Sequence, residues 1–172
     1  MQITDLRIIE TKDGGDCILN ANDLQMISGF QNMPYLGLFG GNVEQSTTGP
    51  KDTEQTFDFW GNYLFHPSLH KIWFNSQTEK LLQTVALNSV GRIEIEQQVK
   101  KDLEFMQEFA NITVNVSLIW VDRIRIEIIL LQPDKLDSTE LVYIWDATNA
   151  ELTEQDLNNG MNVYGIPLNN TL

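Results

Sequence analysis

The sequence has little of what several classes of protein require. It contains one cysteine, Cys17, among 172 residues, which excludes an intrachain disulfide and a cysteine-based zinc cluster. Basic residues are also few, with 11 lysines and arginines against 24 acidic residues and a net charge of −13. Because a field of that sign repels phosphate backbones, we expect no direct nucleic-acid partner.

Long hydrophobic runs are missing as well. No apolar stretch approaches the length of a membrane span, and the N-terminus has no basic region followed by a long apolar segment. We therefore expect no membrane association, no signal peptide and synthesis in the cytosol. In that compartment the sequons at Asn111, Asn115 and Asn169 would stay unglycosylated.

Residues with catalytic or metal-binding chemistry do not form a recognisable set. His66 and His70 have a spacing that can place two imidazoles on one metal, but a proline lies between them and no third ligand type is near. Glu94 and Glu96 would point to different sides of a helix, and Asp58 has no second carboxylate close in sequence. We expect no catalytic, cofactor-binding or metal-binding residues, and keep a peptidoglycan hydrolase that uses Asp58 or Glu94 as the alternative from another class.

The first half of the chain has short periodic segments separated by turn residues. Residues 3–11 alternate apolar and polar positions before the turn-like "KDGGDC", which predicts an N-terminal hairpin. Residues 26–39 have helical apolar spacing interrupted by Pro34, so this stretch is one helix or two short pieces, ended by Gly40 and Gly41. Seven aromatics then lie between Phe57 and Phe74, a density typical of a core wall or a contact surface.

The second half begins with two predicted helices and continues with strands. The later helix places Ile95, Val99, Leu103 and Met106 on one face. The stretch "ITVNVSLIWVDRIRIEIILLQP" then predicts strands over residues 112–120 and 123–131, with a turn near Asp122. "LVYIWDA" predicts one more strand. The expected fold is α+β, a small antiparallel or mixed sheet packed against two or three helices, with an N-terminal hairpin and a C-terminal extension.

Charged residues in the second strand of that hairpin are expected to face solvent. Arg123, Arg125 and Glu127 alternate with isoleucines, as they should on the outer face of a half-buried strand. Alternating charges also protect a sheet edge from unwanted pairing. We interpret them as surface residues rather than as a separate charged site.

The order of these features resembles a known family. Gly14-Gly15-Asp16-Cys17 stands before a segment that ends in Leu38-Phe39, and a Trp-Gly pair follows at 60–61. Ile72-Trp73 precedes the helices, and the alternating hairpin closes on Gln132-Pro133. This pattern is similar to the Mu-type baseplate proteins of contractile-tailed phages, within the lysozyme-like baseplate wedge and tail-sheath initiator superfamily. The resemblance covers residues 1–133, and a Glu-Pro-Arg motif typical of sheath initiators is replaced here by "QEFANI".

The resemblance implies a structural, non-enzymatic virion protein. Such a subunit would be made in the host bacterial cytoplasm and would join wedge, tube and sheath proteins in a six-fold ring around the tail tube. Residues 1–133 would form the wedge-like domain, and residues 134–172 a C-terminal extension or arm. An adaptor or completion protein of a non-contractile tail stays as an alternative.

Docking is expected to occur by sheet-edge pairing and apolar contacts. The candidate partner-binding residues come from the two predicted hairpin strands and from the strand after them. They are Val114, Val116, Leu118, Trp120, Arg123, Arg125, Glu127, Tyr143 and Trp145.

Overall fold

The computed structural model describes residues 4–11, 14–20, 23–40, 76–156 and 161–162. They form an α+β protein whose sheets are all antiparallel, as the sequence predicts. The chain divides into two compact units, Met1–Glu79 and Lys80–Leu172. The aromatic run at 57–74, with Asp58, His66 and His70, lies outside the described residues.

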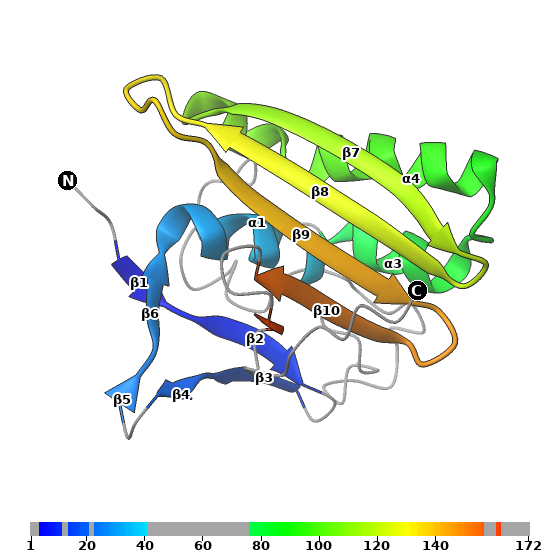
Figure 1. Cartoon of the computed structure of the whole chain (residues 1–172), viewed down its shortest axis with the longest axis horizontal. Helices are drawn as coiled ribbons and strands as arrows, with labels where there is room; N and C mark the ends of the chain where they lie inside the picture. Colours follow the sequence, from blue (N-terminus) through cyan, green and yellow to red (C-terminus); the bar gives the residue numbers. More distant parts are fainter. Residues whose placement is uncertain (1–3, 12–13, 21–22, 41–75, 157–160, 163–172) are drawn as a thin grey trace, which may run out of the picture. The chain divides into compact units, whose positions relative to one another are not determined.

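The first unit consists of short paired strands and one helix. The strands are β1 (Thr4–Leu6), β2 (Ile8–Thr11), β3 (Gly14–Cys17), β4 (Leu19–Asn20), β5 (Asp23–Leu24) and β6 (Met26–Ser28). They pair as β1 with β6, β2 with β3 and β4 with β5 (Figure 1). The β2–β3 pair confirms the predicted N-terminal hairpin, but its returning strand begins at Gly14, inside the stretch "KDGGDC" that the sequence predicts as the turn.

Residues 29–39 form one helix, α1 (Gly29–Phe39), and Pro34 lies inside it. The buried side chain of Asn32 ties the helix to β1, because its Nδ2 donates to Asp5 Oδ2 and to the carbonyl of Leu6, both at 3.0 Å. The helix ends where predicted, at Gly40. A Cβ at that position would lie 2.6 Å from the carbonyl oxygen of Leu36, so only glycine fits this close turn.

The second unit holds a five-stranded antiparallel sheet, the helices α4 and η1, and the later part of α3. Helix α3 (Gln77–Thr84) crosses the division between the units and is followed by α4 (Ser89–Asp102) and the 3₁₀ helix η1 (Glu104–Glu108). The strands are β7 (Asn111–Trp120), β8 (Arg123–Leu131), β9 (Thr139–Asp146), β10 (Glu151–Asp156) and β11 (Met161–Asn162), in the spatial order β11-β10-β9-β8-β7 (Figure 1).

Helix α4 begins at a strong N-cap and lies against β7 (Figure 1). The side chain of Asn88 accepts hydrogen bonds from the backbone N–H groups of Val90 and Gly91, at 2.9 and 3.0 Å, which satisfies two of the donors that a helix start leaves free. The predicted apolar face of this helix and the turn after it is confirmed, because all four of its residues are fully buried. They are Ile95, Val99, Leu103 and Met106.

The core face of the sheet comes from alternate residues of its strands, and β8 supplies its centre. Ile124, Ile126, Ile128 and Leu130 are at most 1% exposed. Ile126 is paired with Val116 of β7 and with Tyr143 of β9, and both neighbours are buried. Burying a side chain of this size contributes about 1.5–3 kcal/mol, so this row is the main stabilising feature of the unit.

Within the expected C-terminal extension, residues 134–172, β9 pairs with β8 along eight positions and is itself flanked by β10. The charged strand β8 is central, so the expectation that its charges protect a sheet edge is wrong. In the part of the chain that the structure describes, the edge strand next to β8 is β7, whose ten residues carry no charge.

Candidate functional site

The structure separates the nine predicted partner-binding residues into two groups. Val114, Val116, Tyr143 and Trp145 are at most 6% exposed, so their side chains belong to the core and are not presented to a partner. The exposed or half-buried group consists of Leu118, Trp120, Arg123, Arg125 and Glu127.

The charged members of that group already have partners within the chain. Arg125 forms an ion pair with Glu127 at 2.9 Å, and Glu127 also accepts from the Nδ2 of Asn115 at 3.1 Å. Arg123 pairs with Asp146 at 3.0 Å. These pairs agree with the interpretation that the three charges are surface residues of a half-buried strand.

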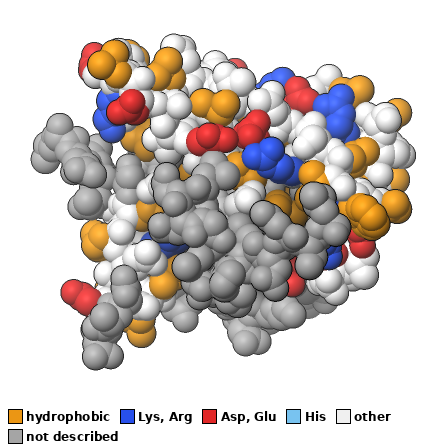
Figure 2. Space-filling model, in the orientation of Figure 1, with side chains coloured by type: hydrophobic (Ala, Val, Ile, Leu, Met, Phe, Trp, Pro, Cys, Tyr) orange, Lys and Arg blue, Asp and Glu red, His pale blue; other side chains and the backbone are white. Residues whose placement is uncertain are grey.

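The most unusual surface lies at the turn between β7 and β8. Leu118, Ile119, Trp120 and Val121, which we call the apolar tip, are four consecutive exposed apolar residues, with Trp120 at 71% and Val121 at 86%. Figure 2 shows hydrophobic side chains gathered at this end of the sheet, on the right of the view. A run of exposed apolar residues of this kind is typical of a contact site.

A β-bulge explains why Trp120 lies outside the core. The register between β7 and β8 shifts between Leu118 and Trp120, so Trp120 pairs with Arg123 and leaves the face of Val114. Strict alternation from Val114 would have placed Trp120 on the core face. Ile119 and Val121 were missed as site residues, although the unbroken apolar run "LIWV" was a readable signal against simple alternation.

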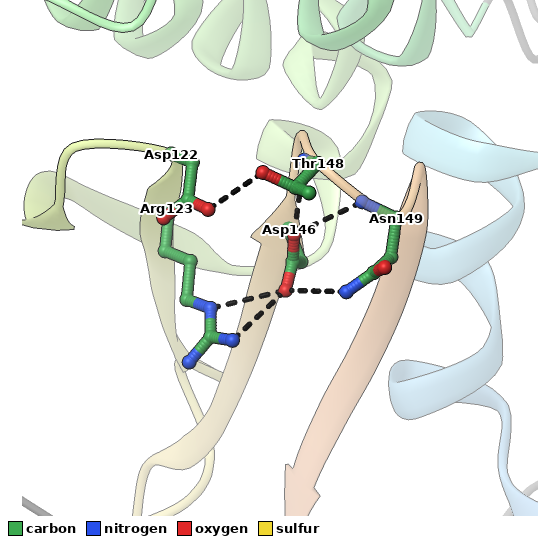
Figure 3. A network of polar contacts seen from close by, with 5 residues as sticks. All are labelled: Asp122, Arg123, Asp146, Thr148 and Asn149. Atoms are coloured by element: carbon green, nitrogen blue, oxygen red, sulfur yellow. Dashed lines mark hydrogen bonds and ion pairs between the residues drawn. The ribbon is translucent and has the colours of Figure 1, made fainter.

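A polar network holds the base of the apolar tip (Figure 3). The Asp146 carboxylate at the end of β9 accepts hydrogen bonds from the side chain of Arg123, from the backbone N–H of Thr148 at 3.0 Å, and from the backbone and side chain of Asn149 at 3.1 Å. Asp122, in the turn itself, accepts from the Thr148 hydroxyl at 2.7 Å. The β7–β8 and β9–β10 turns are thereby joined.

The same contacts control the protonation of Asp146. Partial burial raises the pKa of this carboxyl, but the hydrogen bonds from Asn149 and Arg123 outweigh it and bring the pKa below its ordinary value of 3.8. The group is therefore ionised at neutral pH. An ionised carboxylate accepts stronger hydrogen bonds from this set of donors, and these join the two turns at the base of the apolar tip.

We expect Asp146→Asn to lower the free energy of unfolding by about 1–2 kcal/mol at pH 7, because asparagine cannot pair with Arg123. A lowered folded-state pKa stabilises the fold fully above the unfolded value of 3.8 and loses that effect as pH falls through the folded value. The difference in free energy of unfolding between the wild type and Asp146→Asn should therefore be constant above pH 5 or so and shrink below pH 4 or so. Urea unfolding across this range measures it, and a difference that grows on acidification would contradict the assignment.

The first turns of α4 lie close to the last part of β7. Arg92 donates from Nη1 to the carbonyl of Val116 at 3.1 Å and to Glu96 at 2.9 Å. Glu96 also pairs with Lys100 at 2.6 Å, and the Lys100 hydrogen bond is the main reason that the pKa of Glu96 lies below its ordinary value. Val90 and Ile93, close to Arg92 on the same helix, are also exposed.

The remaining candidates for chemistry do not assemble into a site in the part of the chain that the structure describes. Cys17 is a half-buried residue of β3, and Glu94 is exposed on α4. No group of three or more histidine, cysteine or acidic side chains is placed to hold a metal among the described residues. None of the described helices is long and apolar enough to cross a membrane.

Comparison with protein-family models, with curated proteins and with solved structures gave no match. Of the motifs that carry the baseplate resemblance, Gly14-Gly15-Asp16-Cys17 forms β3 and Leu38-Phe39 ends α1. The Trp-Gly pair at 60–61 and the Ile-Trp pair at 72–73 lie outside the described residues.

Proposed function

We propose that this chain is a structural subunit of a phage tail baseplate, of the wedge or sheath-initiator type, and that it docks neighbouring tail proteins through the apolar tip. The observation that carries the proposal is the exposure of Leu118–Val121 on a hairpin whose turn is hydrogen-bonded to the β9–β10 turn. The order of sequence motifs over residues 1–133 supports the particular type of assembly. No catalytic step is required.

A docking role accounts for the exposed apolar side chains of the tip, which would be unfavourable in a protein that had no partner. Four exposed apolar side chains favour aggregation unless a partner covers them. The apolar tip is followed at once by Asp122 and Arg123, which are held by the network around Asp146. Aromatic residues in such positions often provide much of the binding energy at protein interfaces, so Trp120 is the expected anchor.

Co-expression with sheath and wedge proteins encoded by the same genome tests this function. We expect the wild-type chain to retain at least one of these proteins through affinity and size-exclusion steps. The double variant Trp120→Ser, Val121→Ser should lose the complex by about tenfold or more, since hot-spot residues typically contribute at least 2 kcal/mol each.

A matched control comes from Leu136, which lies between β8 and β9 and is fully exposed. Leu136→Ser removes an exposed apolar side chain outside the apolar tip and should leave the complex unchanged. Equal losses for both variants would show that general surface hydrophobicity, and not the apolar tip, holds the partner. Retention of no tail protein by the wild-type chain would reject the proposed function.

A further inference from the structure

A row of four paired residues crosses the end of the sheet that carries the apolar tip. Trp120 of β7 is paired with Arg123 of β8, which is paired with Asp146 of β9. Asp146 is in turn paired with Glu151, the first residue of β10. Because directly paired residues of antiparallel strands point to the same face of the sheet, Trp120 and these three charged side chains share one surface.

Carboxylates outnumber cations in and beside this row. Arg123 is the one cation of the row, and it is already paired with Asp146 at 3.0 Å (Figure 3). Asp122, in the adjacent turn, adds a further carboxylate. The side chain of Asp146 is only 14% exposed, whereas Glu151 is an exposed residue. Glu151 is therefore the carboxylate of the row that a docked protein can reach.

Two further cations near this end of the sheet do not offset the negative charge. Arg125 lies on the same face of β8 as Arg123 and pairs with Glu127 at 2.9 Å. Arg92 of α4, which donates to the carbonyl of Val116, pairs with Glu96 at 2.9 Å. The surroundings of the apolar tip thus have the same sign as the whole chain, whose net charge is −13.

We propose that the protein docked by the apolar tip offers an apolar pocket for Trp120 and, beside it, a basic side chain that pairs with Glu151. This inference rests on the proposed function and names the chemistry of the partner. The two contacts lie three strand spacings apart, about 14 Å. An interface of ordinary size, which buries about 800 Å² on each partner, covers that distance.

The apolar and the charged contact have different roles in this complex. Burial of Trp120 provides most of the affinity, because aromatic anchors dominate the energetics of interfaces. The charges at the rim act mainly on the rate of association and on the choice of partner. An acidic surface, such as a second copy of this chain with its net charge of −13, is disfavoured. Because salt screens exposed charges, with a Debye length of about 8 Å at 0.15 M, association slows as salt rises.

Removal and reversal of the charge at Glu151 test this inference. The sheath or wedge protein that co-purifies with the wild-type chain is immobilised, and surface plasmon resonance gives the association rate constant of each variant. Glu151→Lys should lower this constant by about five- to tenfold at low salt, and Glu151→Gln, which keeps the size of the side chain, by about two- to threefold. Raising the salt concentration from about 50 to about 500 mM should remove most of both differences.

Asp137→Lys is the matched control. Asp137 is an exposed residue of the loop between β8 and β9, at the opposite end of the sheet from the apolar tip. The substitution changes the net charge by the same amount as Glu151→Lys, and should alter the association rate constant by less than about twofold. Far-ultraviolet circular dichroism checks that the variants are folded.

The outcomes separate this inference from the proposed function. Equal losses for Glu151→Lys and Asp137→Lys overturn the inference, because the overall charge and not the row would then guide association. Faster binding of Glu151→Lys, or association that is independent of salt, also rejects the basic side chain but leaves docking through the apolar tip intact. Retention of no sheath or wedge protein by the wild-type chain rejects the proposed function and this inference with it.

Discussion

Replacing Ile126 with alanine is expected to lower the free energy of unfolding by about 2–5 kcal/mol, the usual cost of truncating a buried isoleucine. Ile126 is fully buried at the centre of the sheet, with Val116 on one side and Tyr143 on the other. Because three adjacent strands are closely packed at this point, we expect little collapse around the cavity. A loss of this size is a large fraction of the 5–15 kcal/mol or so that holds a typical domain together.

The matched control is on the same strand and has the same side chain. Ile129 is only half-buried and lies on the other face of β8, between Thr113 and Glu140. Ile129→Ala should cost clearly less than Ile126→Ala, and Ile126→Val about 0.5–1.5 kcal/mol. Chemical denaturation of the three variants gives the comparison. Equal costs at positions 126 and 129 would mean that the register of β8 is different, because a slip of one residue exchanges the two faces.

Gly91→Ala is expected to destabilise the protein by about 1–3 kcal/mol, the usual cost of overpacking. In an exposed helix interior the same change would stabilise by about 1 kcal/mol, because alanine has the higher helix propensity. At Gly91, however, a Cβ would lie 2.1 Å from the carbonyl oxygen of Ala86. That carbonyl accepts from the backbone N–H of Asn88 at 2.9 Å, so moving it would also disturb the N-cap of α4.

Thermal unfolding with Ser89→Ala as control measures this effect. Ser89 is an exposed residue of the same helical turn, and its replacement should change the free energy of unfolding by no more than about 0.5 kcal/mol. A stabilised Gly91→Ala variant would show that the connection between α3 and α4 moves aside without cost. A loss confined to Gly91→Ala would show that this close approach sets the start of α4.

Local features of the fold were predictable because they depend on residues close in sequence. The N-terminal hairpin, the end of α1 at Gly40, the buried face of α4 and the hairpin around Asp122 all follow from periodicity, glycine and turn chemistry. For residues 26–39 the sequence predicts either one helix or two short pieces, because Pro34 weakens helical propensity. The observed helix is continuous, with buried residues such as Leu38 on its inner side, since burial outweighs local preference.

The candidate site was predicted only in part. The hairpin was identified, and Leu118 and Trp120 are exposed, but four of the nine proposed residues are buried. Alternation alone cannot show which strand ends a sheet or where a bulge interrupts the ladder. The bulge near Ile119 redirects Trp120, and the support of the apolar tip depends on Asp146, which is 23 residues from Arg123.

By itself, the sequence determined the α+β class, the acidic charge and the helices and hairpins, because composition and short-range periodicity decide these. Only the tertiary structure decided that charged β8 is central, that uncharged β7 is an edge strand among the described residues, and that Leu118–Val121 stay exposed. The physical reason is that strand order and register arise from hydrogen bonds between segments far apart in the chain. A side chain's role then depends on which neighbours those bonds bring beside it.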